Sequence, residues 1–110
     1  MVKLEGVVAA KGLKLFAVVD HSVEARGHGL ELRETVVVMF GSPLAGTPVM
    51  QAAPLAALDL PLKVLVWDDE GQTKVTYLSP AGLAARYDLD QDLASRLGGI
   101  DAVTDAALGH

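Results

Sequence analysis

Residues 34–48 read Glu-Thr-Val-Val-Val-Met-Phe-Gly-Ser-Pro-Leu-Ala-Gly-Thr-Pro. The run Val36–Phe40 is apolar on both faces of an extended chain, which predicts a central strand of a sheet. Two pairs then place a helix-capping residue before a proline, Ser42-Pro43 and Thr47-Pro48. Proline is favoured at the first helical position. The spacing therefore predicts a turn or short helix that begins at Pro43 and a helix that begins at Pro48.

Further strand patterns cover residues 13–20, 61–67 and 73–78, and the polar run 68–71 predicts a hairpin between the last two. Helical patterns, broken at one point by Gly98-Gly99, cover residues 4–12, 22–29, 48–54, 80–87 and 88–110. The hairpin makes at least part of the sheet antiparallel. The order of elements predicts one α+β domain over residues 1–110, a two-layer sandwich of a mainly antiparallel sheet with helices on one face.

Composition excludes several classes of protein. Of 110 residues, 51% are hydrophobic, so the chain is not disordered. With 14 acidic and 9 basic residues the net charge is −5, and we expect no nucleic-acid partner. No cysteine is present, which excludes disulfides and thiolate chemistry. The sequence has neither a signal-peptide pattern nor an apolar run of about 18–20 residues, so we expect a cytoplasmic protein without a membrane partner.

The run Phe40–Gln51 also resembles a known family, the bacterial and archaeal domain-of-unknown-function family 302. The same resemblance extends to Lys11-Gly12-Leu13, Phe16–His21, Asp59–Leu62, Val64–Trp67 and Ser79-Pro80. Together these segments span roughly residues 4–108. The resemblance implies a small α+β fold of the TATA-binding-protein-like class, often dimeric. It implies no function, because none is assigned to the family, and any cofactor stays unknown.

The sequence departs from the family pattern at its start. The family usually carries one more strand and the beginning of the first helix before the position of Met1. A sheet without that strand has an uncovered edge, and open strand edges pair readily with other chains. We therefore expect a homodimer.

The loop from Gly41 to Gln51 is the best candidate for a ligand pocket. Two helix starts there would present unpaired N–H groups to an anion, with hydroxyls from Ser42 and Thr47. The alternative is that these hydroxyls only cap helices and that the glycines only form turns. The expected ligand-binding residues are Phe16, His21, Met39, Gly41, Ser42, Gly46, Thr47, Met50 and Gln51.

His21 is the candidate catalytic residue. Asp20 or Glu31 could orient it as a general acid and base. The alternative is that Asp20 caps the turn that follows, since neighbouring strand residues point to opposite faces. A metal site is not expected, because the histidines at positions 21, 28 and 110 lack a paired ligand spacing.

Three hypotheses for function follow from these features. The first is a non-enzymatic, homodimeric module that binds a small apolar or anionic ligand. The second is a protein-interaction module that pairs through its sheet edge. The third is an enzyme that uses His21.

Overall fold

The computed structural model describes residues 2–108 and places an open four-stranded antiparallel sheet at the centre of the chain. The strands are β1 (Lys14–Asp20), β2 (Thr35–Gly41), β3 (Leu62–Asp69) and β4 (Gln72–Thr76). They lie in the order β1-β2-β3-β4, each antiparallel to its neighbour. The predicted α+β class and the central position of β2 are confirmed.

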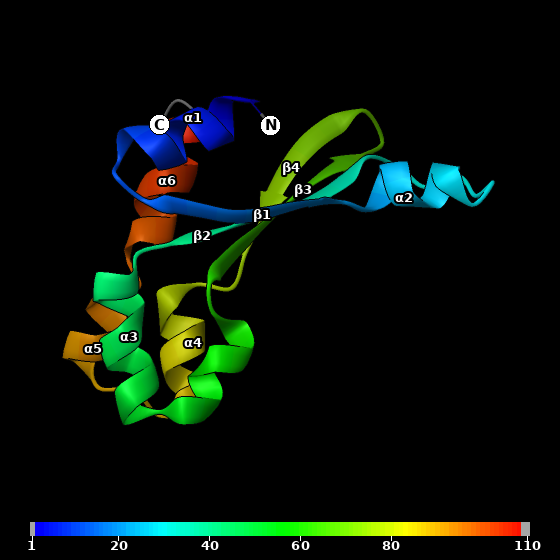
Figure 1. Ribbon diagram of the computed structural model, residues 1–110. Helices are drawn as coiled ribbons and strands as arrows, with labels where there is room; N and C mark the ends of the chain where they lie inside the picture. Colours follow the sequence, from blue (N-terminus) through cyan, green and yellow to red (C-terminus); the bar gives the residue numbers. More distant parts are fainter. Residues whose placement is uncertain (1, 109–110) are drawn as a thin grey trace.

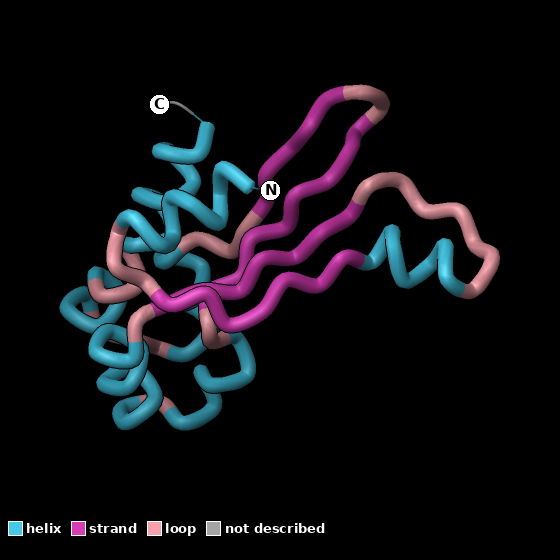
Figure 2. The backbone as a smooth tube through the Cα atoms, turned by 45° about the horizontal axis from the view of Figure 1, so that its top comes forward, coloured by secondary structure: helices cyan, strands magenta, loops and turns pink. Residues whose placement is uncertain are grey.

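All helices of the described chain but one gather around one end of this sheet, and α2 (His21–Gly27) lies at the other end (Figure 1). The others are α1 (Val2–Ala10), α3 (Pro43–Ala52), the 3₁₀ helix η1 (Pro54–Asp59), α4 (Pro80–Tyr87), α5 (Gln91–Ser95) and α6 (Gly99–Leu108). Helices α3, α4 and α5 gather where β1 begins and β2 ends (Figure 1). The β3–β4 hairpin and α2 project at the other end (Figure 2). Within residues 2–108, no helix is both long enough and apolar enough to cross a membrane.

The core lies on one face of β2 and β3. Register pairs Val38 with Val64 and Phe40 with Leu62, so these four side chains share a face. Val38, Phe40 and Val64 are fully buried there. The helices and the α5–α6 connection cover them with Leu4, Val8, Val49, Leu83, Leu97, Ile100 and Val103. Burial of each such large apolar side chain stabilises the fold by about 1.5–3 kcal/mol.

The opposite face of β2 is less covered. The apolar run on both faces predicted a central place for this strand in the sheet, and on this face Val37 and Met39 are half-buried. Residues on this face belong to no buried cluster of the described chain. The sheet is therefore packed by helices on one face only, as the two-layer prediction requires.

Helix α3 corrects the expectation of two helix starts after β2. A single helix runs through Pro43–Ala52 and contains Pro48. Pro48 lacks an N–H and so leaves the carbonyl of Leu44 without its usual partner. The burial of Val49 offsets this loss, because its side chain is fully enclosed by the core. Thr47 is consequently an internal helical residue and not a cap.

The turns and breaks follow the predicted positions closely. Strand β3 extends to Asp69, so the hairpin turn shortens to Glu70 and Gly71, both with positive φ. The C-terminal helical segment is broken before α6, which begins at Gly99 as the glycine pair predicted. The 3₁₀ helix η1, which begins at Pro54, has no counterpart among the predicted elements.

Candidate functional site

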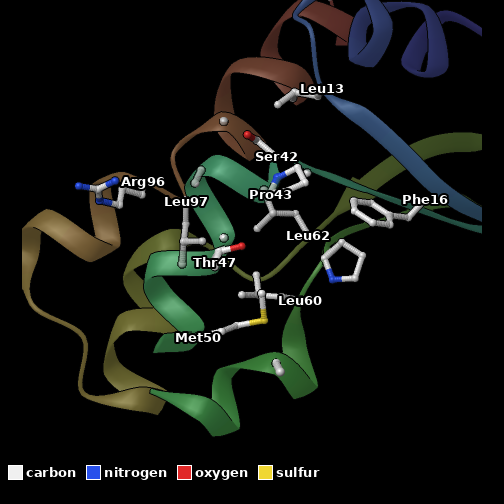
Figure 3. Close-up of a pocket in the computed structure, with 16 residues that line it drawn as sticks. Leu13, Phe16, Ser42, Pro43, Thr47, Met50, Leu60, Leu62, Arg96 and Leu97 are labelled. Atoms are coloured by element: carbon white, nitrogen blue, oxygen red, sulfur yellow. The ribbon is translucent and has the colours of Figure 1, made fainter. Parts of the chain in front are cut away.

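A cavity of about 480 Å³ opens between α3, the start of β1, η1 and the α5–α6 connection (Figure 3). Most of its wall is apolar, from Leu13, Phe16, Met50, Leu60, Leu62 and Leu97. Phe16 and Arg96 lie on opposite sides, with Thr47 and Leu62 between them (Figure 3). Its volume falls within the range of about 300–1,000 Å³ that is typical of small-molecule pockets.

Three side chains give the cavity its polar groups: Ser42, Thr47 and Arg96. Ser42 is the N-cap residue of α3, but its side chain accepts no hydrogen bond from the first turn of the helix. Arg96 follows α5 and is exposed, with its guanidinium 3.6 Å from the Asp92 carboxylate. These groups can orient a ligand that the apolar wall holds.

A second cation lies beside the wall. The ammonium of Lys14 is 5.0 Å from the centroid of the Phe16 ring. This distance is within the range in which a cation is attracted to the face of an aromatic ring. Phe16 is the bulged residue of β1, since the pairing with β2 shifts between Leu15 and Ala17. The bulge bends β1 where it meets the cavity.

Gly46 lines the cavity in the middle of α3. A Cβ atom added at this glycine would meet no heavy atom within 4 Å. A larger side chain therefore has room at this point of the wall. A glycine inside a helix also costs about 1 kcal/mol relative to alanine, so substitution need not weaken α3.

The structure brings six of the nine predicted ligand-binding residues to this cavity. They are Phe16, Gly41, Ser42, Gly46, Thr47 and Met50. Their role in binding stays a prediction. The pattern of residues 41–51 indicated all of them except Phe16, which belongs to β1, because glycines, hydroxyls and a flexible methionine suit a pocket wall.

The other three predicted residues, His21, Met39 and Gln51, do not line the cavity. Strand β1 runs away from the cavity, and five residues of strand carry the chain about 16 Å from Phe16 to His21. Met39 pairs with Lys63 on the open face of the sheet, opposite to Phe40. Gln51 is exposed on α3, because one residue beyond Met50 turns the helix by about 100°.

Part of the cavity wall comes from distant segments of the chain and was not predicted from the sequence. Ala57 and Leu60 reach the cavity through η1 and the residue after it, and Arg96 through the end of α5. The proline at position 54 marked a break but gave no sign of the 3₁₀ helix. No local pattern near Arg96 distinguishes it from an ordinary surface arginine.

For Asp20 the structure shows the second alternative, a helix cap, and not a pairing with His21. Asp20 is the N-cap of α2: its Oδ1 accepts hydrogen bonds from Ser22 Oγ at 2.5 Å and Val23 N at 3.0 Å. These bonds lower the pKa of Asp20. His21 is exposed and makes no hydrogen bond or ion pair with a described residue. Glu31 is likewise exposed, so the acid–base arrangement is absent from the described part of the chain.

Acidic residues of the hairpin and of α5 serve local structure. Asp68 accepts from Gly71 N at 2.9 Å, and Asp69 pairs with Lys74 at 2.6 Å. Asp90 caps α5 by accepting from Leu93 N. Residues 2–108 hold no cluster of three or more potential metal ligands, and His110 lies outside the described residues.

A polar cluster that the sequence did not reveal ties η1 to α4. The Oδ2 atom of Asp59 accepts from Tyr87 Oη at 2.5 Å and from an Arg86 guanidinium nitrogen at 2.8 Å. The hydrogen bond from Tyr87, followed by that from Arg86, lowers the pKa of Asp59. The same bond raises the pKa of Tyr87. This hydroxyl and this carboxylate satisfy each other's hydrogen-bonding capacity without a ligand. Their contact stabilises the cavity wall beside Leu60.

Curated relatives match most of this chain. It is 38% identical over 111 residues to "Fluoride-specific ion channel FluC 1" of Brucella suis biovar 1 (strain 1330), covering 93% of this chain and 44% of that protein. It is equally similar to "Fluoride-specific ion channel FluC 2" of Brucella melitensis biotype 1, of which the match covers 41%. The chain therefore spans less than half the length of these relatives.

A solved structure shares the fold. It is a crystal structure of an uncharacterized conserved protein DUF302 from Bacillus stearothermophilus, with a TM-score of 0.78 and 21% identity. The similarity covers 97% of this chain and 84% of that one. A family model matches residues 1–107 as well, so the chain belongs to the family described as Domain of unknown function DUF302.

Proposed function

We propose that this domain is a small-ligand-binding module and that its ligand occupies the cavity beside α3. The observation that carries the proposal is a cavity of about 480 Å³ with an apolar wall and three polar side chains, Ser42, Thr47 and Arg96. A few polar groups in an apolar concavity are typical of sites that hold and orient small molecules.

The apolar wall limits the affinity and the kind of ligand. A ligand that buries about 200 Å² of apolar surface gains about 5 kcal/mol before the cost of association is subtracted. Contacts with the apolar wall alone therefore favour weak binding, and the polar side chains must supply the rest. A molecule with a compact apolar body fits such a wall.

The names of the curated relatives suggest fluoride as another ligand, but this cavity does not suit that ion. Fluoride is a small, strongly hydrated anion that needs several hydrogen-bond donors in place of water. Among the described lining residues, side-chain donors come from Ser42, Thr47 and Arg96 alone, and a cavity of about 480 Å³ is far larger than this ion. We propose a larger, partly apolar ligand for this domain.

The proposal can be tested by filling the cavity. A Gly46→Leu substitution places an aliphatic side chain where a Cβ meets no atom within 4 Å, so the fold should survive. We expect it to abolish binding of an apolar fluorescent probe, 8-anilinonaphthalene-1-sulfonate, measured by titration. The matched control is Gly6→Leu in α1, where a Cβ also meets nothing within 4 Å. Equal probe binding by both variants and the wild type would overturn the proposal.

Self-association through β1 is a second candidate function. Within residues 2–108, strand β1 is hydrogen-bonded on one side only, and Leu15, Phe16 and Val18 are 40–45% exposed. The other edge, β4, is short and polar and carries Lys74, which discourages pairing. We propose that two copies pair through their β1 strands, because the free N–H and C=O groups of that edge lie among apolar side chains.

Light scattering coupled to gel filtration tests this pairing. The wild type is expected to be dimeric, and Val18→Lys to be monomeric, because a charge at the centre of a β1 pair would be desolvated. Thr73→Lys on β4 is the control and should leave the mass unchanged. A monomeric wild type would remove this candidate and leave the cavity proposal intact.

A further inference from the structure

We infer that the ligand of this cavity is an amphiphilic anion, with an apolar body against the wall and a carboxylate or phosphate-type head at Arg96. The inference rests on the proposed binding function and adds the chemical class of the ligand. It depends on three features of the site: its charge, the availability of the Arg96 guanidinium, and a free hydroxyl.

The charge beside the cavity is opposite to that of the chain. The net charge is −5, with 14 acidic residues. Among the sixteen described residues that line the cavity, however, Arg96 is the only charged one. Lys14, held over the ring of Phe16, adds a second positive charge beside the wall. Positively charged side chains at an apolar opening favour a ligand that is both apolar and anionic.

The guanidinium of Arg96 has N–H donors that are available to a ligand. Its ion-pair partner among the described residues is Asp92, one turn earlier, at 3.6 Å. Both side chains are exposed, with 43% and 77% of their surface accessible, so the pair contributes little. Arginine has five N–H donors in a planar fork, which matches the two oxygens of a carboxylate or phosphate.

The hydroxyl of Ser42 is also available. Three other N-cap residues, Asp20, Ser79 and Asp90, accept a hydrogen bond from the first turn of their helices. Ser42 makes no such bond and lines the cavity instead. It can therefore donate to an anionic or polar head group without any loss to the fold.

Isothermal titration of the full chain with decanoate and decanol tests the inference, because the two probes share a chain and differ in charge. We expect decanoate to bind about tenfold more tightly than decanol, as for one charge-assisted bond. Arg96→Gln should remove this preference, because decanoate then loses its charge-assisted bond. The matched control is Arg26→Gln on α2, far from the cavity, which should retain the preference.

A second variant moves the affinity in the opposite direction. Asp92→Asn removes the competing carboxylate, so decanoate should bind more tightly while decanol does not change. Equal binding of both probes, unaffected by Arg96→Gln, would overturn the anionic head group and leave the proposed cavity standing. Failure of both probes to bind would overturn the proposed function together with this inference.

Discussion

Tyr87 donates its phenolic hydrogen to Asp59 Oδ2 across a distance of 2.5 Å, and this bond holds the end of η1 against the end of α4. Arg86 donates to the same oxygen at 2.8 Å. The segment just before and after Asp59 supplies Ala57 and Leu60 to the cavity. A bond between two residues that do not line the cavity thus positions part of its wall.

Asp59 should make the free energy of unfolding depend on pH in the acidic range. Its folded pKa lies below the ordinary value of 3.8, because Tyr87 and Arg86 hydrogen-bond to the charged form. The stabilisation is fully present above the unfolded pKa and is lost as pH falls through the lowered folded pKa. We expect Asp59→Asn to be less stable than the wild type at pH 7, with a difference that shrinks below about pH 4. Urea unfolding across this range measures it.

Two controls separate this effect from general acid unfolding. Asp20 also has a lowered pKa, so both proteins should lose stability in acid, and the difference between them is the quantity to follow. Tyr87→Phe keeps the ring but removes the donor, and should lower the free energy of unfolding at neutral pH. A difference between wild type and Asp59→Asn that is the same at every pH would contradict the assignment.

Two serines in equivalent sequence contexts should respond differently to alanine. Both precede a proline at the start of a helix, but Ser79 accepts a hydrogen bond from Gly82 N at 3.0 Å, whereas Ser42 caps nothing. Ser79→Ala should therefore cost about 1 kcal/mol of unfolding free energy, and Ser42→Ala close to nothing. Chemical denaturation of both variants provides the comparison. Equal losses would mean that Ser42 stabilises α3 after all.

The same serines show how far the sequence could predict the site. The pairs Ser42-Pro43 and Ser79-Pro80 both predicted a helix start, and both helices begin there. Whether a hydroxyl turns to the backbone or to a cavity depends on tertiary neighbours, which a local pattern does not contain. The wall beside Ser42 comes partly from Arg96, more than fifty residues away in the chain.

The fold was more predictable than the site, for a physical reason. The apolar run 36–40 and the polar hairpin at 68–71 constrain the strands locally, and antiparallel neighbours need only short connections. His21 shows the opposite case. Its place after a strand suggested a site, but the direction of β1 relative to α3 decides on which end of the sheet it falls.

Asp88 offers a route to a more stable protein. It follows α4 in the left-handed conformation, with φ 54° and ψ 46°, and its N–H donates to the carbonyl of Ala84. Glycine adopts this conformation without the steric cost that a Cβ brings. Asp88→Gly should therefore raise the free energy of unfolding by about 0.5–1 kcal/mol, as seen in a higher melting temperature. Asp88→Ala retains the Cβ and should show no gain.

Phe40 connects the core of the sheet to the cavity. Its side chain is fully buried and pairs across the strands with Leu62, whose own side chain reaches the cavity wall. Phe40→Ala should cost about 3–5 kcal/mol, because the lost burial is joined by the cost of the space left behind.

The control for this substitution is Leu44→Ala, since Leu44 is 87% exposed and should change stability by less than about 0.5 kcal/mol. Ligand binding gives a further readout. A Phe40→Leu variant that remains folded should leave Leu62 less firmly supported and weaken binding of an apolar probe. Unchanged probe binding in that variant would show that the wall at Leu62 is supported by the helices and not by β2.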